Sequence, residues 1–96
     1  MGSFSLQQAA ASSPELARVA ERIRQSGDML RAVLPLIPQP MQAHVAAGPV
    51  DGGEWCLLVS NVAVATKLRQ LVPLFTQQLQ QQGWLVQRVR VKVRSA

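Results

Sequence analysis

Residues 86–94 read VQRVRVKVR, a stretch in which valine alternates with cationic residues. Successive side chains of a β-strand point to opposite faces of a sheet, so the valines are expected to face a core and the cations the other side. Because side chains on one face recur about 6.5–7 Å apart, roughly the phosphate spacing of an extended nucleic acid strand, we predict a nucleic-acid contact there. The alternative is a solvated sheet face. The cations, here called the cationic row, are Arg88, Arg90, Lys92 and Arg94.

The charge of the chain is unevenly distributed. Ten Lys and Arg residues stand against five Asp and Glu, a formal net charge of +5. All the acids lie at or before Glu54, whereas six of the ten bases follow it, so the C-terminal part carries only positive charge. Such a surface attracts nucleic acid, an acidic protein or an anionic membrane, and charge alone does not choose among them.

The N-terminal part predicts a tail followed by a helix. Residues 1–13 are mostly serine, alanine and glutamine and are expected to be a flexible tail, which leaves 14–96 as a single domain. Ser13 and Pro14 suit the N-cap and first position of a helix. Apolar residues then recur at helical spacing, in one helix over 14–34 or in two that Gly27 separates. They are Leu16, Val19, Ala20, Ile23, Leu30, Val33 and Leu34.

The opposite side of this helix is charged. Its residues include Arg18, Glu21, Arg22 and Asp28. Carboxylates and guanidinium groups three or four positions apart on a helix are neighbours. We therefore expect these side chains to pair locally, without a further role.

The middle of the chain predicts a β-hairpin. Prolines at 35, 38 and 40 end the helix, with a short helical turn possible near 38–43. Residues 44–50 are expected to form a first strand, and their Gly-Pro pair indicates a bulge or a sheet edge. Residues 51–53 predict the hairpin turn. Residues 54–60 are apolar on both faces, which predicts a central strand.

The segment after the hairpin predicts a long helix over about 62–82. Asn61 suits its N-cap, Pro73 is expected to kink it, and Gly83 is expected to end it, with Trp84 folding back onto the last turn. Two cations on its outer face are further candidate nucleic-acid contacts. They are Lys67 and Arg69.

Together these elements predict an α+β domain in which the helices cover one face of a three-stranded sheet and leave the cationic row on the open face. The second strand, long helix and third strand form a crossover connection. The predicted core consists of apolar residues from the long helix packed on two strands. They are Leu68, Leu71, Phe75 and Leu79 from the helix, and Leu57, Val59, Val89 and Val91 from the strands.

The sequence contains no constellation that predicts catalysis, a metal site or a cofactor. His44 is the sole histidine, the carboxylates show no metal-ligand spacing, and no phosphate-binding loop is present. We therefore expect a protein that is not an enzyme and has no small-molecule substrate. Tyrosine is absent, and Trp55 and Trp84 are expected in the core. Nucleic-acid binding would then be mainly electrostatic and tolerant of sequence.

The single cysteine and the hydropathy pattern indicate the cellular compartment of the protein. Cys56 lies in an apolar stretch and is expected to be buried and unreactive, which suits a reducing compartment. No run of residues reaches the roughly 20 apolar positions of a membrane span, and the start lacks the pattern of a signal peptide. We expect a cytoplasmic protein with no membrane partner.

A set of apolar and turn positions follows the pattern of a known family. They are Leu34-Pro35, His44, Asp51-Gly52, Trp55–Val59, Ser60, Lys67–Gln70, Pro73, Leu79, Gly83 and Val89–Val93. From Met29 onward, over about two-thirds of its length, the chain thereby resembles the DciA family of bacterial replicative-helicase loaders. The resemblance implies a KH-like fold without the Gly-x-x-Gly loop that clamps RNA, and no ATPase motif. It also implies binding to DNA and to the replicative helicase DnaB.

A second resemblance implies a different function. The Gly-Gly turn, the apolar strand, the helix that ends at Gly83 and the final strand are similar to the C-terminal domain of flagellar hook-length control proteins. The Leu-x-Pro-x-x-Leu-Gly signature of that domain is not matched. This alternative implies a protein-interaction module whose basic face meets an acidic partner, with no nucleic acid involved.

Overall fold

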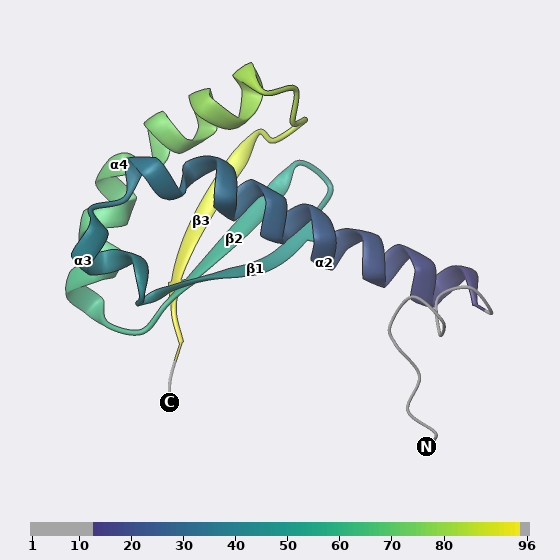
Figure 1. Ribbon diagram of the computed structural model, residues 1–96, viewed down its shortest axis with the longest axis horizontal. Helices are drawn as coiled ribbons and strands as arrows, with labels where there is room; N and C mark the ends of the chain where they lie inside the picture. The colour runs from purple at the N-terminus through teal and green to yellow at the C-terminus, as the bar shows by residue number, and fades with distance from the viewer. Residues whose placement is uncertain (1–12, 95–96) are drawn as a thin grey trace.

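The protein has the predicted α+β architecture (Figure 1), and the computed structural model describes residues 13–94. The tail predicted over 1–13 lies, apart from Ser13, outside the described residues. The elements are α2 (Pro14–Val33), the 3-10 turn η1 (Leu34–Leu36), α3 (Gln39–Gln42), β1 (Val45–Asp51), β2 (Glu54–Val59), α4 (Val62–Gln81) and β3 (Arg88–Val93).

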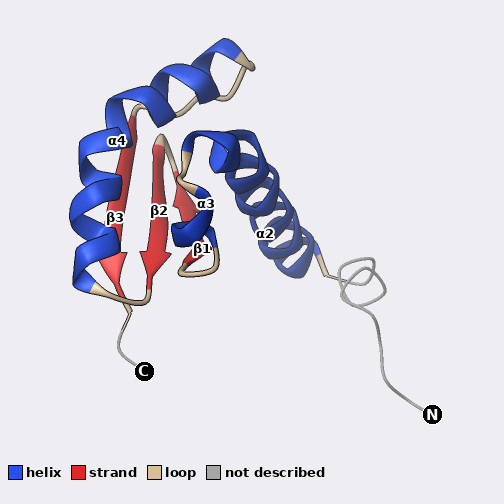
Figure 2. Cartoon of the chain, turned by 60° about the vertical axis from the view of Figure 1, so that its left-hand side comes forward, coloured by secondary structure: helices blue, strands red, loops and turns tan. Residues whose placement is uncertain are grey.

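The three strands form one mixed sheet in the order β1-β2-β3. β1 and β2 pair antiparallel as a hairpin, and β3 pairs parallel to β2. Parallel neighbours need a crossover, and α4 supplies it by running back beside the sheet (Figure 2). β2 is the central strand, as its apolar residues predict.

α2 is one helix that continues through Gly27. The Ser13 hydroxyl accepts a hydrogen bond from the Leu16 N–H at 3.3 Å, so Ser13 is the predicted N-cap, and Pro14 occupies the first helical position. Only the C-terminal half of the helix is buried. Its buried residues are Ser26, Met29 and Val33.

α4 has the predicted signals at both ends. The Asn61 side chain caps its first turn, accepting the third helical N–H at 2.8 Å. Gly83 has a φ of +92°, and the Trp84 N–H donates to the Leu79 carbonyl at 3.0 Å, which is the Schellman arrangement. The helix bends along its length (Figure 2), as expected for a helix that contains Pro73.

β1 contains the predicted bulge. Its pairing with β2 shifts between Ala47 and Val50. A Cβ atom on Gly48 would lie 2.7 Å from the carbonyl oxygen of Cys56, so only glycine fits where the two backbones approach. Pro49 donates no backbone hydrogen bond, which an edge strand such as β1 tolerates.

The hydrophobic core lies between the helices and one face of the sheet. Trp55, Leu57 and Val59 alternate along β2 and are buried together with Met29 of α2 and Phe75 of α4, so both helices cover the same face. The predicted core residues all belong to this core, with Leu71 at its margin. Trp84 also packs against it.

One buried polar side chain fixes α2 to the sheet. The Ser26 hydroxyl donates to the Gly48 carbonyl at 2.6 Å and accepts from the Trp55 indole N–H at 2.9 Å. A buried hydroxyl is costly without partners, and here both the hydroxyl and the indole have one. The bonds join the helix to β1 at its bulge and to the central strand.

Apolar side chains are exposed at two places, and the expectation that Val93 faces the core is wrong. The N-terminal half of the apolar stripe of α2 is not buried, since Leu16, Val19 and Ile23 are 41%, 46% and 58% exposed. Figure 1 shows the N-terminal turns of α2 extending beyond the sheet. Val93, at the end of β3, is 42% exposed rather than buried.

Cys56 is buried, as predicted, and should react slowly with thiol reagents. It is 8% exposed, and its position on β2 places it on the face away from the core. We expect labelling by an aromatic disulfide reagent to be at least about a hundredfold slower in buffer than in denaturant, because the reagent cannot reach the sulfur in the folded state. Equal rates in the two conditions would show that β2 does not protect this thiol.

Candidate nucleic-acid interface

The cationic row lies on the open face of the sheet. All four of its residues are exposed, whereas Val89 and Val91 between them are buried on the core side. Hydrogen bonds hold β3 beside its neighbour at both ends. The Arg88 N–H donates to the carbonyl of Gly53 in the hairpin turn, and the Arg94 N–H donates to the Val59 carbonyl of β2. The structure therefore places the predicted cations on one face of one strand.

The strand register decides what lies beside the row. On β2, Glu54, Cys56 and Leu58 are the partners of Arg88, Arg90 and Lys92. Directly paired residues share a face of the sheet. The cations therefore border a strip that is acidic at the hairpin end and apolar further along.

Glu54 places a carboxylate beside the cationic row. Its side-chain oxygens lie 3.8 Å from the Arg88 guanidinium and 3.7 Å from that of Arg90. These are long, solvent-exposed ion pairs, which contribute little to stability. They do lower the positive potential at this end of the row. Asp51 is paired with Glu54 across the hairpin and adds a second carboxylate one strand further away.

The opposite end of the row has a different polar environment. His44 and Ser60 lie at the ends of β1 and β2, where the Ser60 N–H donates to the His44 carbonyl and the His44 ring Nδ1 lies 2.7 Å from the Ser60 hydroxyl. Arg94 follows the last residue of β3 at this same end, and no carboxylate within residues 13–94 forms an ion pair with it or with Lys92. The two ends of the face therefore differ in charge.

Lys67 and Arg69, the two cations predicted on the outer face of α4, do not join the row directly. Lys67 is half-buried, and Arg69 donates to the Val91 carbonyl at 3.2 Å. Every second residue from Arg88 to Arg94 directs its backbone N–H and C=O groups towards β2. Val91 is one of the residues between these, so its carbonyl points to the free edge of the sheet. Arg69 therefore lies at that edge and occupies one of its open backbone acceptors.

The chemistry available on this face is electrostatic. Within the described chain, no group of three or more His, Cys, Asp or Glu side chains could hold a metal ion, and no helix could span a membrane. Trp55 and Phe75 are buried on the core side, and Trp84 packs against the core. Residues 13–94 therefore offer cations on this face to an anionic partner but no aromatic ring on which a base could stack.

Comparison with models of known protein families and with curated proteins finds no match to either. The nature of the partner must therefore be inferred from the side chains of the face.

The four cations of β3 were predicted from the sequence, but the neighbouring carboxylate was missed. Strand alternation does indicate that Glu54 shares a face of β2 with Cys56 and Leu58. The proximity of Glu54 to Arg88, however, depends on the parallel pairing of β2 with β3, which no local sequence pattern encodes.

Proposed function

We propose that this protein is a non-catalytic adaptor that binds nucleic acid through its cationic row. The supporting observation is the exposure of four cations on one strand of an open sheet face. A row of this kind matches the repeat of a phosphate backbone.

The proposed binding is tolerant of base sequence. Phosphates carry the charge that the row attracts and contain no sequence information. Without aromatic side chains on the face, stacking contributes little. Single-stranded DNA is the best geometric match, because its extended backbone can follow a straight strand, and duplex DNA is expected to bind through fewer of the four cations.

The resemblance to the DciA family gives the proposal a cellular setting. In that setting the KH-like domain binds DNA in the cytoplasm and assists in loading the replicative helicase DnaB. The family acts without hydrolysing ATP, and this chain contains no phosphate-binding loop for a nucleotide. Direct binding between the two purified proteins, measured with and without nuclease treatment, tests the helicase part of the proposal separately from DNA affinity.

The carboxylate beside the row provides a test in which affinity should rise. Glu54→Gln removes a negative charge that lies within 4 Å of two arginines of the row. In water, the Coulomb repulsion between this unit charge and a phosphate about 7 Å away is roughly 0.6 kcal/mol. We therefore expect this variant to bind single-stranded DNA about twofold to threefold more tightly at 50 mM salt, as measured by fluorescence anisotropy.

Asp51→Asn is the matched control for this experiment. It removes the same charge from the residue paired with Glu54, but on a strand about 4.8 Å further from β3. Its gain in affinity should be clearly smaller. An unchanged or lower affinity of Glu54→Gln would show that DNA does not approach the row.

A further inference from the structure

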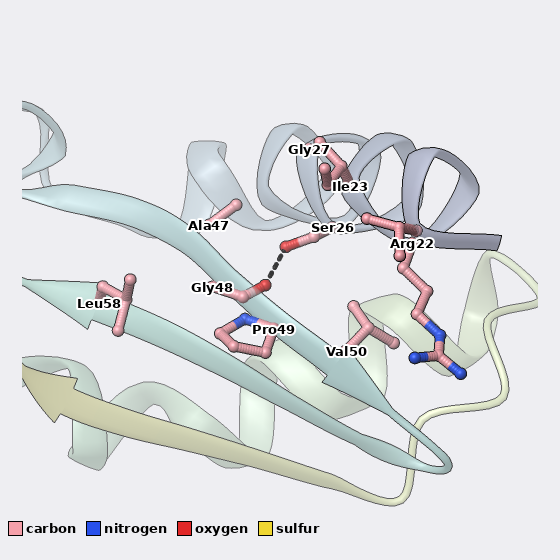
Figure 3. A pocket seen from close by; sticks show the side chains of 10 residues that line it. Arg22, Ile23, Ser26, Gly27, Ala47, Gly48, Pro49, Val50 and Leu58 are labelled. Atoms are coloured by element: carbon pink, nitrogen blue, oxygen red, sulfur yellow. Dashed lines mark hydrogen bonds between the residues drawn. The ribbon is translucent and has the colours of Figure 1, made fainter. Parts of the chain in front are cut away.

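A second surface lies at the opposite edge of the sheet from the cationic row. α2 and the bulge of β1 enclose a groove of about 610 Å³ (Figure 3), here called the apolar groove. Its lining is apolar apart from Arg22 and Ser26, and the Ser26 hydroxyl already bonds to Gly48 and Trp55. The apolar residues that line it include Val19, Ile23, Ala47, Pro49, Val50 and Leu58.

The groove continues into the exposed stripe of α2. Leu16, Val19 and Ile23 are each more than two-fifths exposed and follow the spacing of one helix face. From residue 16 to residue 27 the helix rises about 16 Å, the length of three turns of a second helix. An elongated apolar track of this kind suits an amphipathic helix with anchors at positions i, i+3 or i+4, and i+7.

The charges around the groove are positive and favour a partner that carries carboxylates. Among residues 13–94, Arg22 is the only charged residue of the lining, and Arg18 lies one turn before it on α2. Neither arginine forms an ion pair within residues 13–94, so the expectation that they pair locally is wrong. No carboxylate lines the groove.

Two of the three carboxylates of α2 are engaged with other arginines of the helix. Glu21 bonds to Arg24, and Asp28 bonds to both Arg24 and Arg31. The hydrogen bond from Arg24 lowers the pKa of the Glu21 carboxyl, so the pair stays charged at neutral pH. Neither Glu21 nor Asp28 forms an ion pair with Arg18 or Arg22.

We propose that the apolar groove is a docking site for an acidic amphipathic helix of a partner protein. The apolar face of that helix would lie on Ile23, Val19 and the residues of β1, and its flanking carboxylates would meet Arg18 and Arg22. The concave shape favours an inserted helix over a flat surface. This site goes beyond the nucleic-acid interface, since the groove and the cationic row lie on opposite edge strands.

The test uses designed 14-residue helical peptides and the full chain. One peptide carries leucines at i, i+3 and i+7 flanked by glutamates, a second replaces the glutamates by lysines, and a third scrambles the first. We expect the acidic amphipathic peptide to bind at least about tenfold more tightly than either of the others in fluorescence anisotropy. Ile23→Ser should weaken that binding at least about tenfold without changing the affinity of the protein for DNA.

Two double variants with equal loss of net charge test the charge assignment. Replacing Arg18 and Arg22 by glutamine should weaken binding of the acidic peptide about tenfold, whereas replacing Arg90 and Lys92, on the opposite edge strand, by glutamine should leave its affinity within about twofold. The proposal is overturned if the acidic peptide binds no better than the lysine or scrambled peptide, or if both double variants behave alike. It is also overturned if Ile23→Ser abolishes self-association or binding to anionic vesicles while peptide binding is absent.

Discussion

Replacing Phe75 by alanine is expected to lower the free energy of unfolding by about 3–5 kcal/mol. The ring is fully buried in the core that α4 forms against the sheet. Its removal loses the transfer free energy of the ring and leaves a cavity that the bent helix cannot close. Since the total stability of a domain of this size is on the order of 5–15 kcal/mol, the variant should unfold at least about 12 °C below the parent. Thermal and urea unfolding followed by circular dichroism measure both quantities.

Leu74 provides the matched control on the same helix. It is the preceding residue, has a similar apolar side chain and is 49% exposed. Leu74→Ala should cost less than about 1 kcal/mol, because little apolar area returns to water. Equal destabilisation by the two substitutions would mean that the face of α4 assigned to the core is incorrect.

The fold was largely predictable because local chemistry determines most of its elements. The alternation of β3, the N-caps Ser13 and Asn61, and the glycine that ends α4 each act within a few residues, so they can be read without knowledge of the rest. The extent of burial along α2 could not be predicted in this way. Helical spacing identifies the apolar positions of a helix, but it does not show which of them the rest of the fold covers, and here Met29 is buried whereas Ile23 is exposed.

The candidate interface was predictable only in part. Strand alternation placed the four cations on one face, since that depends on β3 alone. The proximity of Glu54 to Arg88 depends on the pairing of β3 with β2, and the bond from Arg69 to Val91 depends on the path of α4. Both are contacts between segments far apart in the sequence, which side-chain periodicity does not encode.

The second large effect is expected from replacing the cationic row by glutamine. If each of its four side chains meets one phosphate of a single strand, the log–log salt slope of binding is near −3. The affinity of the parent protein should then fall roughly fifty-fold between 50 and 200 mM salt. The quadruple variant keeps the valine face, so it should remain folded, because exposed substitutions usually change stability by less than about 0.5 kcal/mol each.

A charge-matched variant separates the row from net charge. Replacing the four arginines of α2 by glutamine also removes four charges, which lowers the net charge from +5 by the same amount. If non-specific attraction to the whole surface were responsible, the two quadruple variants would lose DNA affinity equally. The four arginines are Arg18, Arg22, Arg24 and Arg31.

The salt slope of single-stranded DNA binding, measured side by side for the parent and both quadruple variants, tests the proposed interface most directly. We expect a slope near −3 for the parent and for the α2 variant, and a slope near zero with weak binding for the variant of the cationic row. Binding of the folded row variant with the parental slope would contradict the interface. Absence of binding by the parent at 50 mM salt would contradict it as well, and would favour an acidic protein partner for this face.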